Sequence, residues 1–378
     1  MKYKLGDICF YAKGKVDVTE LTEKNYISTE NMLSNKGGVT TASSLPRTVQ
    51  TQQYQQYDTL VSNIRPYFKK IWFAESDGGC SNDVLVLRAK EGIDAKFLYY
   101  VLADDAFFDY SNATSKGTKM PRGDKNAIMQ YPVPAFDLET QQKIAGILSD
   151  IDDKIELNRQ INDNLLQQAQ ATFQNELLSV QTLPAGCKQA SLIDIADYLN
   201  GLAMQKYRPE NGEMGIPVLK IKELRQGYCD DSSELCSPNI KSDYIVHDGD
   251  VVFSWSGSLL VDFWCGGTCG LNQHLFKVTS AKYDKWFYYA WTKHHLDRFI
   301  AVAADKATTM GHIKRDELAK ATVLIPAEDD YKRIGELFQP IYNLIIAKRI
   351  ENKHLAETRD TLLPKLMSGE IDVSNIQL

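Results

Sequence analysis

The chain has 378 residues, of which 43% are hydrophobic and 24% are charged, and its formal net charge is −6. That balance is typical of a globular protein and excludes a largely disordered or low-complexity chain. No stretch approaches the 18 apolar residues of a membrane span, and the first 14 residues lack a signal-peptide core, so we expect a cytoplasmic protein. The seven cysteines are accordingly predicted to be reduced thiols, and because neither of the closest pairs, Cys229/Cys236 and Cys265/Cys269, is a Cys-x-x-Cys motif, we expect no zinc site.

Residues 1–135 mix short alternating β segments with one helix. We predict strands at 59–64 and 83–88, a helix at 96–110, and a final proline-containing strand at 131–134. Together these elements indicate a compact α+β domain.

Residues 136–180 hold 8 acidic and 3 basic residues and are predicted to form one long helix. Their apolar side chains recur at alternating steps of four and three, which is the spacing of a coiled-coil seam. The predicted seam consists of Ile144, Leu148, Ile151, Ile155, Asn162 and Leu165, with Asn158 completing the spacing.

Residues 181–327 again predict an α+β domain, with strands at 216–221 and 250–255, a helix at 285–301 and a strand at 322–326. The chain ends with a second predicted long helix and a short tail.

This last segment, residues 328–378, repeats the heptad spacing of the first helix. Its seam consists of Ile334, Phe338, Ile341, Ile345, Asn352 and Leu355.

The two halves of the chain are related by an internal repeat. Adding 190 to a residue number carries Ile144 to Ile334 and Asn162 to Asn352 without a gap. We predict that Asn162 and Asn352 face each other or polar atoms of the facing helix; the alternative is that both are tolerated at the surface. The sequence thus predicts an α+β fold in which two globular domains are separated by a pair of long antiparallel coiled-coil helices, with a pseudo-two-fold internal repeat.

Four short stretches make the chain similar to a known family. They are residues 131–134 (YPVP) leading into 141–145 (QQKIA), 151–155 (IDDKI), 247–252 (HDGDVV) and 362–371 (LLPKLMSGEI). With the repeated order of domain and helix, they make the whole chain resemble the specificity subunit of Type I restriction–modification enzymes. One departure is that the second helix lacks counterparts of Gln141 and Gln142.

The resemblance implies that residues 1–135 and 181–327 are target recognition domains, each of which reads one half of a bipartite double-stranded DNA sequence. It implies that the helices in residues 136–180 and 328–378 set the spacer between the half-sites and dock two methyltransferase subunits. Restriction and motor subunits would join through those partners. The chain itself would perform no chemistry and would have no contact with a membrane.

The sequence contains no catalytic motif that contradicts this interpretation. It lacks both an Asn/Asp-Pro-Pro-Tyr methyltransferase motif and a glycine-rich phosphate loop, and its six histidines are scattered, so we expect no metal and no cofactor. Two alternatives remain open. One is a coiled-coil structural adaptor whose domains bind proteins, and the other is an enzyme acting on a small molecule between Cys229 and His274.

In the first domain the candidate DNA contacts are basic and amide side chains, which suit phosphates and base edges. Most of them lie in two runs, residues 63–70 and residues 115–125. The alternative for the second run is a solvated loop, and for Tyr67 and Phe68 in the first run it is packing in the core. The candidates are Arg47, Asn63, Arg65, Lys69, Lys116, Lys119, Arg122 and Lys125.

In the second domain Lys220 and Lys222 are predicted to alternate along a strand and share a face. Asn272 and Gln273 offer amides that suit adenine, with local backbone capping as the equally open alternative. The candidates are Lys220, Lys222, Trp255, Ser256, Asn272, Gln273, Lys306, Thr309 and Lys314. Because this domain is less basic, we expect partner subunits to supply many of the phosphate contacts.

Overall fold

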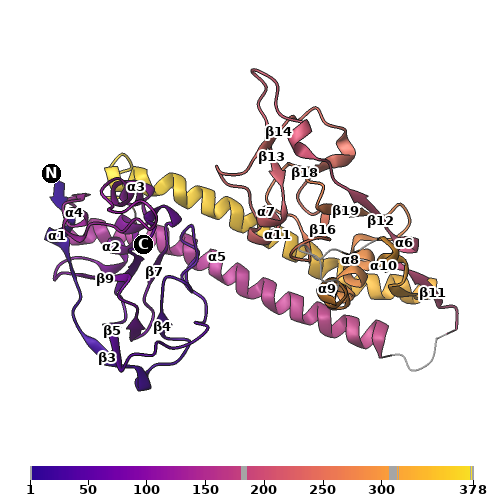
Figure 1. Ribbon diagram of the computed structural model, residues 1–378, viewed down its shortest axis with the longest axis horizontal. Coiled ribbons are helices and arrows are strands. Elements are labelled where there is room, and N and C mark those ends of the chain that lie inside the picture. The colour runs from indigo at the N-terminus through magenta and orange to yellow at the C-terminus, as the bar shows by residue number, and fades with distance from the viewer. Residues whose placement is uncertain (1, 180–184, 306–312, 314, 375, 377–378) are drawn as a thin grey trace. The chain divides into compact units, whose positions relative to one another are not determined.

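The computed structural model describes residues 2–179, 185–305, 313, 315–374 and 376 (Figure 1). The chain forms two compact units, one made of Met1–Asp153 with Ala356–Leu378 and the other of Lys154–Leu355. No described helix combines the length and the apolar character needed to cross a membrane.

The first unit contains two four-stranded sheets and a separate strand pair. One sheet has the strand order β2-β9-β6-β7, the other has the order β3-β5-β8-β4, and β1 pairs with β10. The strands are β1 Lys2–Lys4, β2 Cys9–Tyr11, β3 Lys15–Asp17, β4 Tyr26–Ile27, β5 Gln50–Tyr54, β6 Thr59–Ser62, β7 Ile71–Phe73, β8 Gly78–Cys80, β9 Val84–Ala89 and β10 Pro132–Pro134. The short helices are α1 Leu5–Ile8, α2 Ala95–Ala103, α3 Asp105–Ala113 and α4 Lys125–Ile128.

The single helix predicted at 96–110 is in fact two helices, α2 and α3, and that prediction was wrong. Asp104 has extended backbone angles, and its carboxylate accepts the N–H of Ala106 at 3.0 Å, so it ends α2 and caps α3. The helix predicted at 285–301 is likewise divided, at His295, into α8 and α9. Apolar periodicity alone does not reveal such a break, because both helices bury apolar residues.

The second unit has the same kinds of element. Its sheets have the orders β12-β19-β16-β17 and β14-β13-β18-β15, and β11 pairs with β20. The strands are β11 Lys188–Ser191, β12 Asp197–Asn200, β13 Ile216–Leu219, β14 Leu235–Cys236, β15 Ile245–Val246, β16 Val251–Ser254, β17 Leu260–Phe263, β18 Cys269–Leu271, β19 Leu275–Thr279 and β20 Thr322–Ile325. The short helices are α6 Leu192–Ile195, α7 Ile221–Gln226, α8 Lys285–His294, α9 Leu296–Asp305 and α10 Arg315–Ala319.

The predicted internal repeat appears in the sheet topology. The first sheets correspond strand for strand, and each second sheet contains a parallel pair, β4 with β8 and β13 with β18, next to an antiparallel strand. The fourth strand differs, because β3 extends the sheet at β5 whereas β14 extends it at β13. The globular part of each unit, which we call its head, therefore has the same scaffold with differently built sheet edges.

A buried ion pair is also repeated. Asp58, directly before β6, has a side chain only 1% exposed and accepts two hydrogen bonds from Arg88 of β9 at 2.7 and 2.8 Å. In the second unit Asp250, directly before β16, contacts Lys277 of β19 at 2.9 Å. In each head this pair joins the same two strands of the first sheet.

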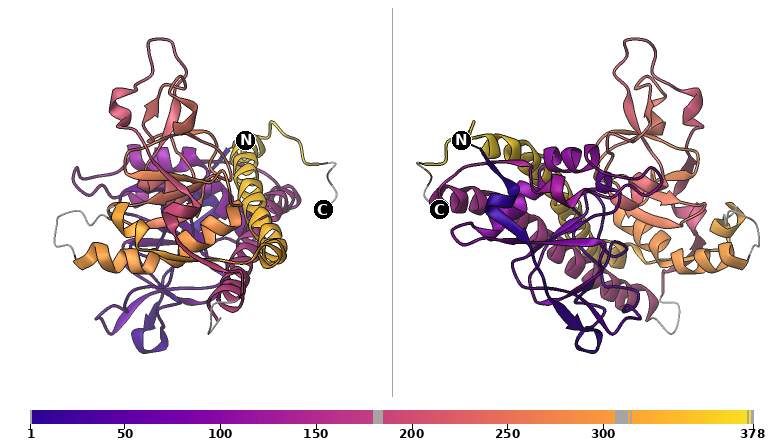
Figure 2. Two further views of the ribbon diagram at one scale, coloured as in Figure 1. Left: turned by 90° about the vertical axis from the view of Figure 1, so that its right-hand side faces the viewer. Right: turned by 60° about the vertical axis from the view of Figure 1, so that its left-hand side comes forward.

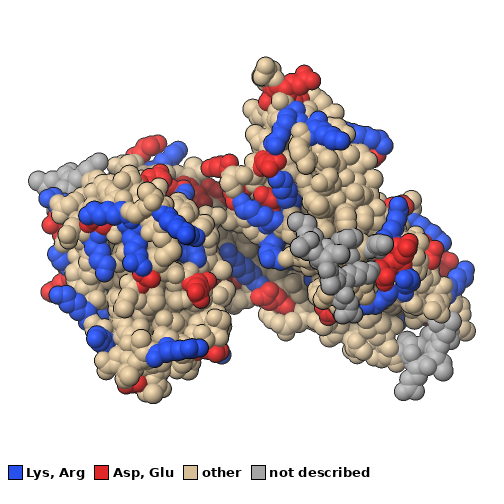
Figure 3. Space-filling model, in the orientation of Figure 1, with Lys and Arg blue, Asp and Glu red and all other residues tan. Residues whose placement is uncertain are grey.

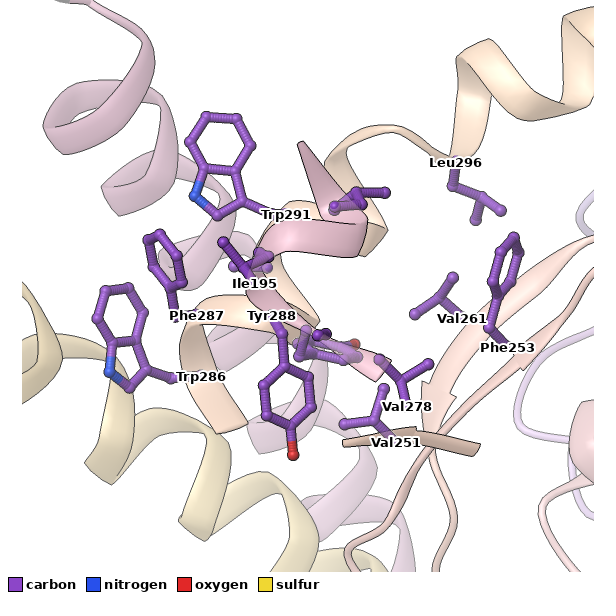
Figure 4. Close-up of a cluster of buried hydrophobic side chains, with 14 of the residues drawn as sticks. Ile195, Val251, Phe253, Val261, Val278, Trp286, Phe287, Tyr288, Trp291 and Leu296 are labelled. Atoms are coloured by element: carbon purple, nitrogen blue, oxygen red, sulfur yellow. The ribbon is translucent and has the colours of Figure 1, made fainter. Parts of the chain in front are cut away.

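Aromatic side chains of α8 form much of the core of the second unit. In one buried cluster, Tyr288 lies beside Val251 and Val278 of the first sheet, while Trp286 and Phe287 lie farther from the sheet (Figure 4). The indole of Trp286 stacks on Phe338 of the C-terminal helix, α11 (Glu328–Ser368), with ring centroids 5.2 Å apart. The core of this unit thus joins its sheet to the long helix.

The two long helices are α5 Leu138–Phe173 and α11 Glu328–Ser368, close to the predicted bounds. In the first unit they run antiparallel, since Asp152 of α5 contacts Arg359 of α11 at 2.7 Å while the earlier Lys143 bonds the carbonyl of the later Ser374 at 2.9 Å. Figure 2 shows the end of α11 beside the start of α5.

The helices are antiparallel in the second unit as well. Asn158 bonds Asn352 at 2.8 Å, while Glu176, just beyond α5, contacts the earlier Arg333 at 2.8 Å. The predicted antiparallel pairing is therefore confirmed in each unit.

The predicted seam residues are buried or half-buried, but many of them also pack against a head. Ile144 and Leu148 share a cluster with Phe97 of α2 and with Leu363 of α11. In the second unit the seam positions Ile334, Phe338, Ile341 and Ile345 belong to the core that contains Trp286, with Leu165 packed against it. Of the others, Ile155 is buried, and Ile151 and Leu355 are half-buried. The seam residues therefore pack against the α+β part of each unit as well as against the facing helix.

Asn352 takes the second of its two predicted arrangements, because it faces polar atoms of α5. Its amide nitrogen donates to the carbonyl of Ile155 at 3.1 Å, and its oxygen accepts from Asn158 at 2.8 Å. Asn162 is 6% exposed, and its side-chain oxygen has no hydrogen-bond partner among the described residues. The two repeat-equivalent asparagines therefore do not pair with each other.

Candidate nucleic-acid interface

In the first unit, two runs that the sequence presents separately meet at one place. They are the loop that follows β6, residues 63–70, and the loop between α3 and α4, residues 114–124. The N–H of Arg65 donates to the carbonyl of Pro121 at 2.8 Å, and the N–H of Gly123 donates to the carbonyl of Asn63 at 3.1 Å. We call these two loops the first loop pair.

A short turn in the first loop pair presents two aromatic rings to solvent. The turn, Pro66–Phe68, is flanked by Arg65 and Lys69, whose φ angles of 51° and 50° are left-handed values that non-glycine residues rarely adopt. Tyr67 is 48% exposed and Phe68 is 37% exposed, with ring centroids 4.7 Å apart. These rings therefore do not fill the core, and they are available to stack on another molecule.

Lys69 is held by an acidic neighbour rather than being free. Its ammonium group and that of Lys36 each lie 2.9 Å from the carboxylate of Asp105 on α3. Burial alone would raise the pKa of Asp105, but the hydrogen bonds from Lys69 and Lys36 hold that pKa below its usual value. The ammonium group of Lys36 also lies 3.9 Å from the carboxylate of Asp360, so the two lysines beside the aromatic turn are both paired with acids.

The second loop of the pair carries further basic groups. Arg122 contacts Asp83 at 2.9 Å, and Lys116 bonds Asp124, whose pKa is lowered mainly by that hydrogen bond. Lys119 is exposed and is not bonded to another described residue. Figure 3 shows Lys and Arg side chains gathered on the face of the first unit that the view presents.

Two buried polar atoms of the first loop pair have no partner among the described residues: Oδ1 of Asn63 and Nε of Arg65. Buried polar groups are normally hydrogen-bonded, so orphaned ones at a surface loop mark a place for a ligand or for water. Gly123 makes the close approach possible, because a Cβ there would lie 2.9 Å from Oδ1 of Asn63.

The two remaining candidates of the first domain lie outside the first loop pair. Arg47 is exposed in the loop before β5, on the second sheet. Lys125 is the first residue of α4, and its ammonium group lies 5.8 Å from the ring of Tyr11.

The second unit builds a corresponding site after β16. The carbonyl of Trp255 accepts the N–H of Ile313 at 3.1 Å, which reproduces the contact between Asn63 and Gly123. The indole of Trp255 is half-buried, donates to Oδ1 of Asn200 at 2.9 Å and stacks on Phe276. The backbone N–H of Trp255 also donates to the carbonyl of His274 at 3.4 Å, and we call residues 255–258 and 272–274 the second loop pair.

His274 is the centre of the second loop pair. Ser256 lies 3.1 Å from one ring nitrogen of His274, and the amide of Gln273 lies 3.4 Å from the other. Asn272 is buried, and its side-chain oxygen accepts the backbone N–H of His274 at 3.2 Å. Asn272 thus makes the local backbone-capping bond, Ser256 is buried beside His274, and Gln273 is half-buried. His274 was not among the DNA contacts predicted from the sequence.

Lys220 and Lys222 do not alternate along a strand, and that prediction was wrong. β13 ends at Leu219, and Lys220 is the N-cap of α7, where its backbone N–H donates to Glu223 at 3.2 Å. The capping glutamate three residues on starts a helix despite the preceding apolar run. Lys220 contacts Glu234 at 2.6 Å, and Lys222 contacts Asp230 at 3.0 Å.

Arg225 is a candidate that sequence reasoning missed. Together with Ile221, Lys222, Gln226 and Ser258 it lines a surface hollow of about 330 Å³ beside α7. The helical spacing of three and four residues from Lys222 to Arg225 and Gln226 was the signal that could have identified it.

Lys306, Thr309 and Lys314 lie outside the described residues. Only Ile313, between them, fixes where this part of the chain meets Trp255. Among the described residues no cluster of three or more histidine, cysteine or acidic side chains is arranged to hold a metal ion.

Comparison with known proteins gives one consistent family. The model of the Type I restriction modification DNA specificity domain matches residues 1–167 and 184–355. The Type I restriction enzyme MjaIX specificity subunit of Methanocaldococcus jannaschii is 25% identical over 312 residues, which cover 76% of this chain and 71% of that protein. The HindI specificity subunit of Haemophilus influenzae is 21% identical, with 98% and 99% of the two chains covered.

A solved structure shows the same fold. The Type I restriction–modification S subunit from M. genitalium superposes with a TM-score of 0.59 at 15% identity, and the match covers 97% of this chain and 96% of that one. The resemblance inferred from the sequence motifs is thus confirmed. With one specificity domain in each half, the chain belongs to the family of Type I restriction modification DNA specificity proteins.

Proposed function

We propose that the chain is the non-catalytic DNA-recognition subunit of a Type I restriction–modification complex. Each head would read one half of a bipartite double-stranded target, the first through the first loop pair and the second through the second loop pair. The chain would act in the cytoplasm, where it would meet its DNA target. The observation that carries it is a backbone contact that both heads repeat among unlike side chains, Gly123 with Asn63 in the first and Ile313 with Trp255 in the second.

That construction repeats a backbone contact and changes the chemistry around it. Gly123 meets Asn63 in the first head, and Ile313 meets Trp255 in the second. Around the first contact lie Lys and Arg side chains and an exposed aromatic pair; around the second lie an indole, an imidazole and an amide. One scaffold with two surfaces is what reading two different half-sites requires.

In the first head the aromatic turn and its basic neighbours would act together. Lys119 and the Lys36–Lys69–Asp105 cluster suit phosphates, while Asn63 and Arg65 carry the unsatisfied atoms that suit base edges. Tyr67 and Phe68 are placed to press on sugars or on a base step, as apolar side chains do in minor-groove complexes.

In the second head the contacts would be mainly polar. Gln273, Ser256 and His274 form a cluster whose donors and acceptors suit base edges. Arg225 and Lys222, at the rim of the hollow beside α7, suit phosphates. The sequence of this head is less basic than that of the first, so partner subunits would supply part of its phosphate contacts.

The long helices would set the spacer and dock two methyltransferase subunits, through which restriction and motor subunits join. At 1.5 Å per residue the 36 residues of α5 extend about 54 Å. That length exceeds one turn of B-DNA, which advances about 34–36 Å.

Mapping methylated bases in cells that express the chain with its cognate methyltransferase tests the proposal. We expect methylation at one bipartite sequence with a fixed unread gap, and its loss when the chain is deleted. A coiled-coil adaptor for proteins would leave the methylation pattern unchanged on deletion, and that result would refute the assignment.

A further inference from the structure

Two cysteines of the second unit lie in direct contact without being bonded. The sulfur atoms of Cys229 and Cys269 are 3.4 Å apart, and both residues are free thiols. Among the seven cysteines, this is the pair whose sulfurs lie within hydrogen-bonding distance. Forty positions separate them in sequence.

The two thiols lie in different surroundings, one within a sheet and the other in a connection between two elements. Cys269 is buried in β18, which is hydrogen-bonded to β13 on one side and β15 on the other. Cys229 is half-buried in the connection of residues 227–234 between α7 and β14, and it packs against the apolar cluster that contains Cys269, Leu224 and Trp264. To reach a bond of about 2.05 Å, the sulfurs need approach by only about 1.4 Å.

We propose that Cys229 and Cys269 are a redox-sensitive dithiol, which a hydroperoxide converts to a disulfide that fastens residues 227–234 to β18. The Cys229 thiolate attacks one peroxide oxygen, the O–O bond breaks, and the other oxygen leaves as water or an alcohol after taking up a proton. The sulfur of Cys269 then attacks the resulting sulfenic acid, the S–O bond breaks, and water carries away the oxygen and the thiol proton.

The two thiols differ in the way this order of events needs. Cys229 is the more exposed of the pair, and a hydrogen bond from the Cys269 thiol lowers the pKa of Cys229. The same contact and burial raise the pKa of Cys269. The less buried cysteine is therefore the one that ionises more readily, and the buried one resolves the sulfenic acid.

The other cysteines of the chain lack this arrangement. Burial raises the pKa of Cys9 and of Cys80 to about 12 in the first unit, and that of Cys265 to about 11 in the second. Cys236 is fully buried, and Cys187 is half-buried. The first head therefore has no counterpart of the pair, and the oxidation is specific to the second head.

The bond would fix a segment that also holds α7. The ammonium group of Lys222 donates a hydrogen bond to the carboxylate of Asp230, next to Cys229, at 3.0 Å. It donates another to the hydroxyl of Ser232 at 2.7 Å. Fastening Cys229 to β18 thus limits the movement of the acidic partner of Lys222. The dithiol chemistry itself does not depend on what the heads bind.

Peroxide titration of the purified full-length chain tests the proposal. We expect two of the seven thiols to disappear, one cross-linked peptide joining Cys229 to Cys269 in the mass spectrum, and full recovery with dithiothreitol. Cys187→Ser, Cys236→Ser and Cys265→Ser are matched controls that keep the cross-link, while Cys229→Ser loses it.

Cys269→Ala provides a second measurement, because it removes the resolving thiol from the buried strand. In that variant we expect a sulfenic acid at Cys229 that dimedone traps, whereas the wild-type chain gives the disulfide instead. If Cys269→Ala fails to fold, the Cys229→Ser result with its controls decides. A cross-link that survives Cys229→Ser, or seven thiols still titrating after peroxide treatment, would overturn the proposal.

Discussion

Arg65 combines an unfavourable backbone conformation with a side chain that has an unsatisfied buried atom. Its φ of 51° orients the turn that exposes Tyr67 and Phe68, and its Nε has no partner among the described residues. Backbone strain that the surrounding structure maintains is commonly found at functional sites. We therefore interpret Arg65 as a residue retained for contact with DNA rather than for stability.

Replacing Arg65 with alanine and with glycine separates the contribution of its side chain to DNA binding from the effect of its backbone conformation on stability. Both changes remove the guanidinium group, so both should weaken binding of the methyltransferase complex to its target by about 10- to 100-fold. Arg65→Gly should be the more stable of the two by about 1 kcal/mol, because glycine adopts the left-handed conformation without strain.

Filter binding and urea unfolding measure the two effects. Unchanged binding in both variants would remove Arg65 from the interface, and an alanine variant as stable as the glycine variant would contradict the strain.

His295 gives the second unit a predictable dependence on pH. It is 9% exposed, its Nε2 lies 2.8 Å from the carbonyl of Thr322, and burial lowers its pKa below the usual 6.5. Between the two pKa values the unfolded chain binds more protons than the folded one, so the free energy of unfolding falls as pH drops below about 6.5.

We expect a smaller free energy of unfolding at about pH 5.5 than at about pH 7.5, in urea unfolding measured at both values. His295→Gln keeps a donor for Thr322 and should flatten the profile, with a smaller residual from His294, whose pKa burial also lowers. A variant as sensitive to pH as the wild type would show that His295 is not responsible.

How much of the candidate site could be predicted depended on local sequence. The runs at 63–70 and 115–125 were recognisable because basic and aromatic residues follow a strand or flank glycines. Their meeting through Arg65 and Pro121 was not predictable, since it depends on how α3 packs within the fold. His274 was missed because its role comes from neighbours such as Ser256, 18 positions away.

At the scale of elements, the long helices were predictable to within a few residues and the shorter ones were not. Thirty-six and 41 residues of sustained periodicity override any local preference. The ends of α2, α3 and α7 depend instead on a single capping residue, Asp104 or Glu223. The sequence also could not show what the seam residues pack against. The same apolar residues suit contact with Trp286 of the head and contact with another helix.

The polar contact between Asn158 and Asn352 should specify the register of the helix pair at a cost in stability. Asn352→Leu leaves the fully buried Asn158 without its main acceptor, so we expect the free energy of unfolding to fall by about 1–3 kcal/mol. Changing both residues to leucine should recover that loss or exceed it, because Asn158 is then no longer a buried amide without its acceptor.

A double-mutant cycle in urea unfolding checks this coupling. Single and double changes whose effects simply add would show that the two asparagines do not interact.

At the scale of the whole molecule, the duplication explains the division of labour. Two copies of one α+β head and one long helix give two surfaces with a common scaffold. The heads differ where the fourth strand is added and where side chains reach the surface, while the long helices keep the same seam. Sequence recognition and spacing are therefore expected to vary independently.

Inserting one heptad into both α5 and α11, at equivalent positions between the mapped repeats, tests the central claim most directly. The insertion lengthens each helix by about 10 Å, or about three base pairs of B-DNA, without changing either loop pair. Mapping methylated bases in cells that carry the variant should show both half-sites unchanged and the gap between them longer by about three base pairs. An unchanged gap, or altered half-sites, would contradict the claim that the helices set the spacing and the heads set the sequence.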